Sequence, residues 1–290
     1  MVYTIEIIIG LVLGIIAYVS QYLGKGVQKF AIEGYKNRSK YSGKGKNTGI
    51  WIFGTILTSI FMFIQWIALL FAPINLIAPI EGLGLIVLVF FSYYVLKEPI
   101  SKNQIFAVVL ILSGIVLITL FNVNPSEISF NTLKIEMLVF LSVVVIVIEL
   151  IIYSFSKYYN LRIVGFILGI TAGTFVALQT ASKRITAIPN SNLSIIFIII
   201  TFIMAIFSLI FTQYAFTKAN ANTVVPCSTS SSILLAIFIG VFSLSEQIVL
   251  HQIVGVVFLI GGIILLTGFS PKSEIERRKI ENKMNRNYRS

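Results

Sequence analysis

Nine long apolar segments are the feature of this sequence that most constrains its fold. Each is long enough to cross a hydrocarbon core of about 30 Å as a helix. Only 11% of the 290 residues are charged, whereas a soluble domain carries about 25% charged residues. We therefore expect an all-α fold, a polytopic membrane helix bundle with nine transmembrane helices. The segments are residues 4–24, 49–71, 74–96, 103–121, 134–154, 163–182, 194–217, 222–243 and 248–269.

The supply of reactive side chains argues against most kinds of enzyme. Cys227 is the only cysteine and His251 the only histidine, so no internal disulfide and no cysteine metal cluster can form, and a multi-histidine site or a Ser/His/Asp triad is almost excluded. The sequence also lacks the glycine-rich P-loop pattern that binds ATP phosphates. We expect neither enzymatic activity nor a cofactor.

Basic residues are distributed unevenly between the two sides that nine spans would define. The loop 25–48 and the tail 270–290 each hold seven lysines and arginines, and their side holds 19 of the 22 in total. By the positive-inside rule, this predicts a cell-membrane protein with the N-terminus outside and the C-terminus cytoplasmic. Basic segments this dense also occur in nucleic-acid-binding proteins. Because both adjoin membrane spans, we expect anionic lipid headgroups as their partners and no nucleic acid.

The chain matches itself at several points in the same order. GLVLGIIA at 10–17 and GFILGITA at 165–172 agree at five of eight positions. Asn75 and Pro79 match Asn222 and Pro226 with the same spacing, and a Ser-Gly-Ile triplet ending at Ile115 matches Gly-Gly-Ile ending at Ile263. Chance similarity between apolar helices is the alternative. These matches predict an internal repeat.

The repeat predicts the organisation of the chain. Residues 1–121 would form a first repeat of four spans, residues 122–160 a connecting fifth span, and residues 161–269 a second repeat of four spans. A basic cytoplasmic tail would occupy residues 270–290. An offset of five spans reverses the direction of the second repeat, and inverted repeats are typical of secondary transporters, which bind substrate between the halves.

The motifs of both halves resemble those of the drug/metabolite transporter superfamily. They are FAP at 71–73 with AP at 78–79, LKEPIS at 96–101, NANTVVP at 220–226 and LSEQ at 244–247. Within that superfamily the chain is most similar to the NIPA-type magnesium-transporter family. The resemblance implies a secondary transporter that moves magnesium or a similar divalent cation by alternating access.

Glu81 is the first candidate for the transport site. A charge at membrane depth costs roughly 2.5–3.5 kcal/mol on insertion scales and marks a functional site by default. Pro79 disturbs the preceding turn, and Gly82 and Gly84 allow close backbone approach. We predict that this stretch is one wall of the substrate site, with hinges at Pro79 and its repeat mate Pro226. The alternative is that Glu81 is protonated or paired and only packs near the interface.

Polar residues of the second half are expected to complete the site. Ser228 and Thr229 begin a hydroxyl-rich run at the repeat position of Glu81, and they either face it or bond their own helix. The amide oxygens of Asn75 and Asn222 are predicted to contribute further contacts.

A second carboxylate lies deep in the connecting span. Glu149 would join Glu81 in binding substrate and as a metal ligand, or else only bond a neighbouring helix. The weaker candidates are Gln65, Gln179 and Gln213. For Glu98 and Glu246, at span ends, we expect helix capping or loop pairing.

The residues leave the substrate open between two classes. Magnesium prefers carboxylate, carbonyl and water oxygens, and the predicted spans contain no lysine or arginine deep inside them. A small metabolite or amino acid, exported in exchange for protons, is the alternative. It is favoured by Met62, which stands where the family has an acidic residue. A non-transporting membrane scaffold is a further alternative, and partners beyond the substrate are limited to lipid and to a homo-oligomer, which stays open.

Overall fold

The computed structural model describes seven stretches of the chain, and every regular element in them is a helix. The stretches are residues 5–36, 44–95, 102–120, 133–159, 164–188, 193–218 and 221–268. The elements are α1 (Ile5–Lys36), α2 (Lys44–Phe71), α3 (Ile74–Ile77), the 3₁₀ turn η1 (Ala78–Ile80), α4 (Glu81–Tyr94), α5 (Lys102–Leu120), α6 (Ile135–Tyr158), α7 (Val164–Ile185), α8 (Leu193–Lys218), α9 (Ala221–Phe242) and α10 (Leu250–Gly268).

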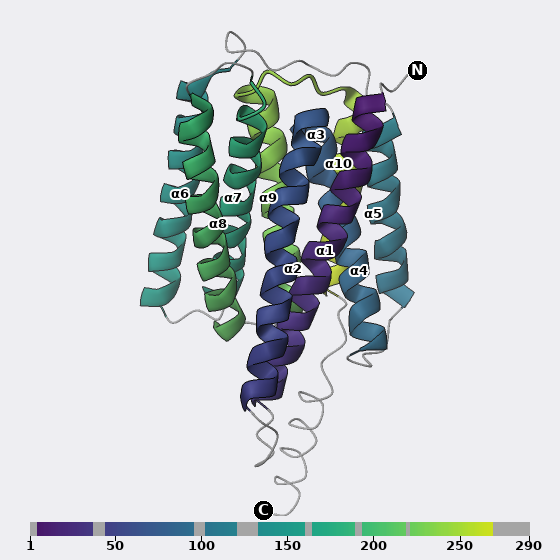
Figure 1. Ribbon diagram of the computed structural model, residues 1–290, viewed down its shortest axis with the longest axis vertical. Helices are drawn as coiled ribbons and strands as arrows, with labels where there is room; N and C mark the ends of the chain where they lie inside the picture. Colours follow the sequence, from purple (N-terminus) through teal and green to yellow (C-terminus); the bar gives the residue numbers. More distant parts are fainter. Residues whose placement is uncertain are drawn as a thin grey trace, which may run out of the picture.

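The long helices run side by side and alternate in direction (Figure 1). In that view α1 begins at the upper end of the bundle, and the connection from α9 to α10 crosses the same end. The end of α1 and the beginning of α2 lie at the lower end. The upper end and the lower end of the bundle are defined by these helix ends.

Length and apolar surface mark this bundle as one suited to a membrane. Seven helical segments of the described chain are long and apolar enough to cross a bilayer, and apolar parts of α5 and α10 form two shorter ones. The side chains of α6 and α8 are largely exposed, with Ile151 63% and Ile195 67% accessible, whereas α7 and α9 are mostly buried. Because water would disfavour so much exposed apolar surface, these are features of a membrane-embedded helical bundle.

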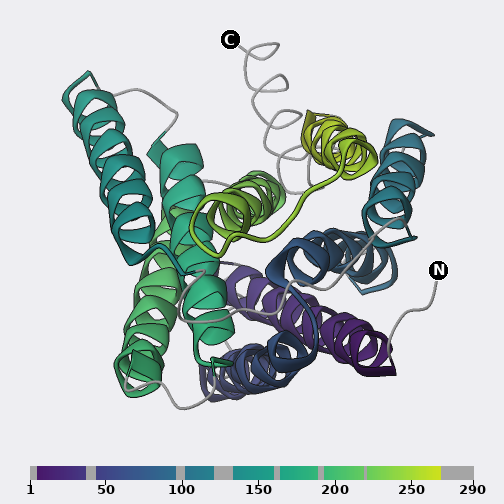
Figure 2. The same cartoon turned by 90° about the horizontal axis from the view of Figure 1, so that it is seen from above.

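The helices pack in corresponding pairs. α1 packs along α2 as α7 packs along α8, and α1 contacts α4 as α7 contacts α9. α5 and α10 pack against each other (Figure 2). The pairs place α1 and α2 on one side of the interior and α7 and α8 on the other.

The chain breaks after α2, where the prolines predicted it. Pro73 is extended (φ −66°, ψ 156°) and starts the single turn α3. Pro79 lies in η1, so the segment 74–94 is a short helix, a 3₁₀ turn and a longer helix instead of one continuous element. Pro226, the second predicted hinge, lies inside the continuous helix α9. The described structure therefore breaks at only one of the two prolines.

Two helices extend past the boundaries that their charges suggested. α1 continues to Lys36, so the predicted loop 25–48 is wrong in its first half, and Lys25 and Lys29 are buried. α7 likewise includes Lys183 and Arg184, also buried. A lysine or arginine does not by itself end a helix, because its long apolar stem can pack inside the bundle. Two candidate spans therefore contain basic residues, with Lys25 in the first and Lys183 and Arg184 in the last turn of α7.

Candidate functional site

Glu81 is the first residue of α4 and is almost fully buried. The Tyr22 hydroxyl of α1 donates to its Oε1 at 3.2 Å. The Ser232 hydroxyl of α9 donates to its Oε2, and the Tyr22 hydroxyl also shares a hydrogen bond with that of Thr229. A carboxylate of the first half is thus held by α1 and by hydroxyls of the second half.

Gly84 makes the position of Tyr22 possible. A Cβ atom added at Gly84 would overlap the Tyr22 ring, so only a residue without a side chain lets the ring lie flat against α4. With the ring in that position, the hydroxyl reaches both Glu81 and α9. This contact is a physical reason for the glycine that follows Glu81 by three residues.

Lys25 lies one turn further along α1, and its ammonium is 4.4 Å from the centroid of the Tyr22 ring. No ion pair or hydrogen bond of its ammonium occurs among the described residues. Lys25 lines a cavity of about 270 Å³ between α1, α2, α7 and α8. The cavity therefore has a cation on its wall.

Amide side chains line the same cavity. Gln28 accepts a hydrogen bond from Gln213 at 3.3 Å and donates one to Thr55 at 3.1 Å. Gln21 Oε1 is buried without a partner in the described chain, and no hydrogen bond of Gln179 is found there. Of the glutamines that the sequence suggested, the cavity includes Gln179 and Gln213. They combine with Gln21 and Gln28, which the sequence reading had not selected.

A buried network separates the cavity from the upper end. The amide nitrogen of Gln65 donates to the Tyr18 hydroxyl at 2.8 Å and to Thr180 at 3.3 Å. Lys183, which has no accessible surface, donates to the Gln65 oxygen at 2.7 Å and lies 5.1 Å from the centroid of the Phe61 ring. Both polar ends of Gln65 are satisfied, so this network links α1, α2 and α7 tightly.

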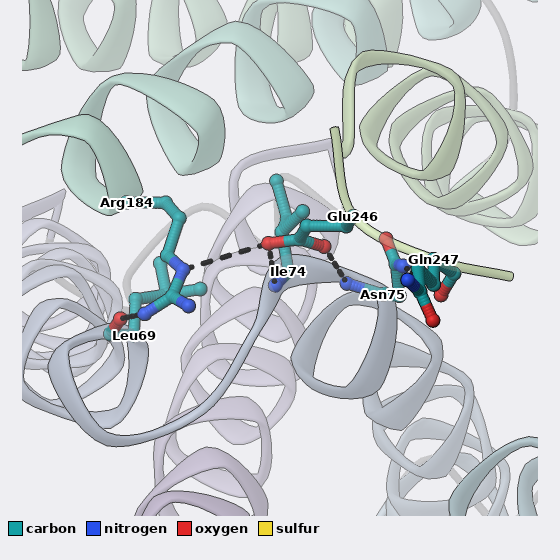
Figure 3. Close-up of polar contacts among 6 residues, drawn as sticks. All are labelled: Leu69, Ile74, Asn75, Arg184, Glu246 and Gln247. Carbon is teal, nitrogen blue, oxygen red and sulfur yellow. Dashed lines mark hydrogen bonds and ion pairs between the residues drawn. The ribbon is translucent and has the colours of Figure 1, made fainter. Parts of the chain in front are cut away.

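A second polar cluster closes the upper end itself (Figure 3). Glu246, between α9 and α10, lies 3.5 Å from Arg184 of α7. It also accepts the backbone N–H groups of Ile74 and Asn75 at 3.0 Å each, and Arg184 donates to the Leu69 carbonyl at 2.7 Å. Of the two roles expected for Glu246, helix capping or loop pairing, the structure shows capping, and the helix is α3. Glu98 lies outside the described residues.

Burial raises the pKa of the Glu246 carboxyl above its ordinary value. The guanidinium of Arg184 and the two N–H groups act in the opposite direction. The carboxylate depends on these partners because charge is costly to bury when it is not compensated. The Glu246 contacts therefore form one cluster in which the loss of one partner affects the others.

Asn75 belongs to this upper cluster and not to the Glu81 site, which corrects the prediction. Its Nδ2 donates to the Gln247 carbonyl at 3.2 Å, and its Oδ1 packs against Gly240. Asn75 lies in α3 and Glu81 begins α4, with the turn η1 between them, and the two side chains bond to different partners. The side chain of Asn222, its repeat mate, lies outside the described residues.

Glu149 occupies a separate site. Thr174 donates to its Oε1 at 2.6 Å and shares a 3.2 Å hydrogen bond with Ser231, while Oε2 has no partner in the described chain. Thr174 and Ser231 also line a mainly apolar cavity of about 700 Å³ among α6, α7, α9 and α10. Ser231 of α9 bonds to Thr174, the partner of Glu149, whereas the next residue, Ser232, bonds to Glu81.

The two carboxylates predicted as metal ligands are therefore not brought together. Glu81 and Glu149 bond to different side chains, and among the described residues no three Asp, Glu, His or Cys side chains lie together so that they could hold a metal ion. Glu81 begins α4 and bonds to α1 and α9, whereas Glu149 lies on α6 and bonds to Thr174 of α7.

The hydroxyl run of α9 both bonds its own helix and faces Glu81, the two alternatives that the sequence allowed. Thr229 donates to the Val225 carbonyl at 2.9 Å and Ser232 to the Thr229 carbonyl at 3.0 Å, both within the helix. The same two residues reach Tyr22 and Glu81. Ser228 is buried where α9 crosses α7 at Gly173, so close that a Cβ there would overlap the Ser228 carbonyl.

Sequence reasoning missed Tyr22 and Lys25, and it named Ser232 only as part of the hydroxyl run that begins at Ser228. A signal was present, because Tyr18, Tyr22 and Lys25 recur at helical spacing and form a polar stripe on one face of α1. Placing Lys25 in a loop hid that stripe.

Comparison of the chain with family models, with curated proteins and with solved structures finds no match.

Proposed function

We propose that this chain is an integral membrane secondary transporter of the drug/metabolite type, which moves a small solute by alternating access. The observation that carries the proposal is a cavity with Lys25 on its wall, next to the buried Glu81–Tyr22 pair, between α1–α2 and α7–α8. Ionisable groups inside a membrane bundle are costly and mark substrate or ion pathways. A scaffold would have no use for them.

Matching contacts in the two halves support an inverted repeat. Gly14 packs on Ile77 and Ile80, whereas Gly169, its sequence match, packs on Val224 and Cys227. Ile77 and Ile80 correspond to Val224 and Cys227 in the alignment that pairs Asn75 with Asn222 and Pro79 with Pro226. Equivalent glycines therefore contact equivalent residues.

The crossing of α5 and α10 follows the same symmetry. Gly114 contacts Gly255 and Leu259, and Gly262 contacts Ala107 and Ile111. Gly114 corresponds to Gly262, Ala107 to Gly255 and Ile111 to Leu259, each pair being 148 residues apart. Such a contact maps onto itself when the halves exchange, so we place the pseudo-two-fold axis at this crossing.

Alternating access assigns a role to each polar layer. The Arg184–Glu246 cluster and the Gln65–Lys183 network hold the upper end closed in this conformation, with the cavity below them. Opening that end requires α3 and α7 to separate from the α9–α10 connection. The break at Pro79 lets α3 move without unfolding α4.

The geometry favours a small organic solute, exchanged for protons, over magnesium. A divalent cation needs several oxygen ligands at one point, but Glu81 and Glu149 are apart and the cavity has a lysine on its wall. Glu81 is the group we assign to proton binding. Magnesium remains the second candidate because Glu149 Oε2 is a buried carboxylate oxygen without a partner in the described chain.

We assign the lower end of the bundle to the cytoplasm. Four basic residues are buried and are not counted as exposed charges: Lys25, Lys29, Lys183 and Arg184. The excess of basic residues is still at the lower end. Loop 37–43 and the tail 270–290 would meet anionic headgroups there. In a Cys227→Ser background, Ser42→Cys should react with an impermeant maleimide only in inside-out vesicles. Reaction in intact cells would reverse the orientation.

Transport by purified protein in liposomes tests the proposal. The panel contains the proteinogenic amino acids, short organic acids, small amines and Mg²⁺, the last followed with a trapped dye. Glu81→Gln keeps the size of the side chain and an acceptor for Tyr22 but removes the charge. Glu136→Gln, an exposed residue in the first turn of α6, is the matched control.

We expect flux of at least one organic solute, dependent on a pH gradient, reduced in Glu81→Gln and unchanged in Glu136→Gln. Flux of Mg²⁺ alone would establish the second candidate. No flux of any compound from a folded preparation would favour the scaffold alternative, and equal flux in both variants would remove Glu81 from the mechanism.

A further inference from the structure

We propose that Lys25 binds a carboxylate group of the transported solute, and that Gln21 and Gln179 bind the solute's other polar groups. This inference rests on the proposed transport function and specifies its substrate class as a small carboxylic acid, most simply an amino acid. Neither the sequence motifs nor the repeat pointed to this subsite.

The Lys25 ammonium is a buried cation whose hydrogen-bonding capacity is not used in the described structure. An ammonium has three donors, but this one lies over the face of the Tyr22 ring and has no hydrogen bond or ion pair with a described residue. Glu81, its closest counter-charge, is already held by Tyr22 and Ser232. The unused donors lie on the cavity wall, where an anionic group would satisfy them.

The amides around Lys25 are suited to the rest of such a solute. Gln21 is 5% exposed, and its Oε1 has no partner in the described chain. A buried acceptor without a hydrogen bond destabilises the protein, and rotation of the side chain towards an ammonium or hydroxyl of the solute would remove that cost. Gln179, on the opposite wall, can supply both a donor and an acceptor.

Charge and size narrow the ligand further. Lys25 is the only ionisable side chain among the described residues that line the cavity, so one negative charge is matched. A phosphate would call for several charged donors, typically including arginine. The volume of about 270 Å³ is just below the range of roughly 300–1,000 Å³ for sites of drug-sized ligands. Lys183 is separate, since it lies over Phe61 and is bound by Gln65.

Binding, measured without transport, tests this inference. Purified protein in detergent is screened for thermal stabilisation by the proteinogenic L-amino acids and by short mono- and dicarboxylic acids. Each stabilising compound is then compared with its carboxamide, which has the same shape without the charge. The variants are Lys25→Met and Lys25→Arg. Lys29→Met, a buried lysine of the same helix outside the cavity lining, is the matched control.

We expect a carboxylate compound to bind, its carboxamide to bind about ten- to a hundredfold more weakly, and Lys25→Met to show the same loss. Lys25→Arg should keep part of the affinity and Lys29→Met all of it. Melting of each variant without ligand shows whether it is folded. If Lys25→Met is unfolded, the carboxamide comparison and Lys25→Arg decide in its place.

The inference and the proposed function fail differently. If no carboxylate stabilises the protein, or if carboxamides bind equally well, the subsite is refuted, although flux of an amine or of Mg²⁺ would keep the transporter. If a carboxylate binds at Lys25 but nothing crosses the liposome membrane, the subsite stands and the transport proposal fails.

Discussion

Removing the charge of Glu246 should loosen the upper end of the bundle more than any other conservative substitution there. In Glu246→Gln an NH₂ group replaces one of the two acceptor oxygens. The glutamine therefore cannot accept the N–H groups of both Ile74 and Asn75 in the present geometry. Arg184 also loses its buried counter-charge. The Arg184 side chain is 8% accessible and the Glu246 side chain is fully buried. Breaking a buried pair by removing one partner costs about 3–5 kcal/mol.

The loss of these contacts destabilises only the conformation in which the upper end is closed. The Glu246 contacts join the α9–α10 connection to α7 and to α3, and they are lost when the upper end opens. At about 1.4 kcal/mol per factor of ten, a loss of about 3 kcal/mol raises the ratio of open to closed protein by roughly a hundredfold. Substrate release on the lower side should slow accordingly.

Cysteine labelling measures the opening. Thr180 lies within the Gln65 network and is 2% exposed, so Thr180→Cys in a Cys227→Ser background should react slowly with an impermeant maleimide from outside. Addition of Glu246→Gln should accelerate that reaction greatly, whereas addition of Glu136→Gln should not. An unchanged labelling rate in a folded Glu246→Gln protein would refute the closure.

A double-mutant cycle separates the ion pair from the cap. Arg184→Met also leaves a buried charge without its partner, so each single variant includes that cost. The combined variant should therefore be perturbed by less than the sum of the two single effects. Strict additivity would show that Arg184 and Glu246 do not interact energetically.

Three further predictions concern single side chains. Gly84→Ala should displace the Tyr22 ring, lower stability by about 1–3 kcal/mol and reduce flux; the control Gly261→Ala, which has space for a Cβ, should change neither, and an equal melting temperature for both would contradict the packing argument. Lys183→Met should leave the melting temperature equal or raised, because an apolar side chain replaces a buried cation, while flux falls; a fully active variant would show that this lysine has no role in transport. Glu149→Gln should remain folded, since it can still accept from Thr174, but should impair transport, and parental flux would make Glu149 structural.

The helical class of the fold could be predicted because it follows from length and composition. Apolar segments of membrane length have few other ways to satisfy their backbone groups. The break near Pro79 was equally readable, since a proline removes a hydrogen bond wherever it stands. Pro226 shows the limit of that reasoning, because it lies inside α9 and the helix continues through it.

The boundaries of α1 and α7 could not be predicted from charge. Lys25 and Lys183 look like loop residues in a sequence, but whether a lysine leaves the membrane depends on what the neighbouring helices offer it. Lys183 finds the Gln65 oxygen of α2, which is 118 residues away in the chain. Such partners are set by tertiary packing, which the local pattern does not contain.

The site was predictable where repeat and helix geometry agreed. Glu81 and the hydroxyl run of α9 occupy the same repeat position, and the structure places Thr229 and Ser232 beside Glu81. Asn75 was misplaced because a motif gives spacing along the chain and not the level of each residue in the bundle. Six residues were enough to move it to the closed end.

Solute counterflow tests the central claim, alternating access, most directly. Proteoliposomes are loaded with an excess of the unlabelled solute and diluted into a trace of the labelled one, with no ion gradient. A carrier that exposes one site to each side in turn should draw label in above its equilibrium level for a time, and Glu246→Gln should change the rate of that exchange. Label that only equilibrates, without a transient excess, would contradict alternating access and indicate a channel or a passive leak.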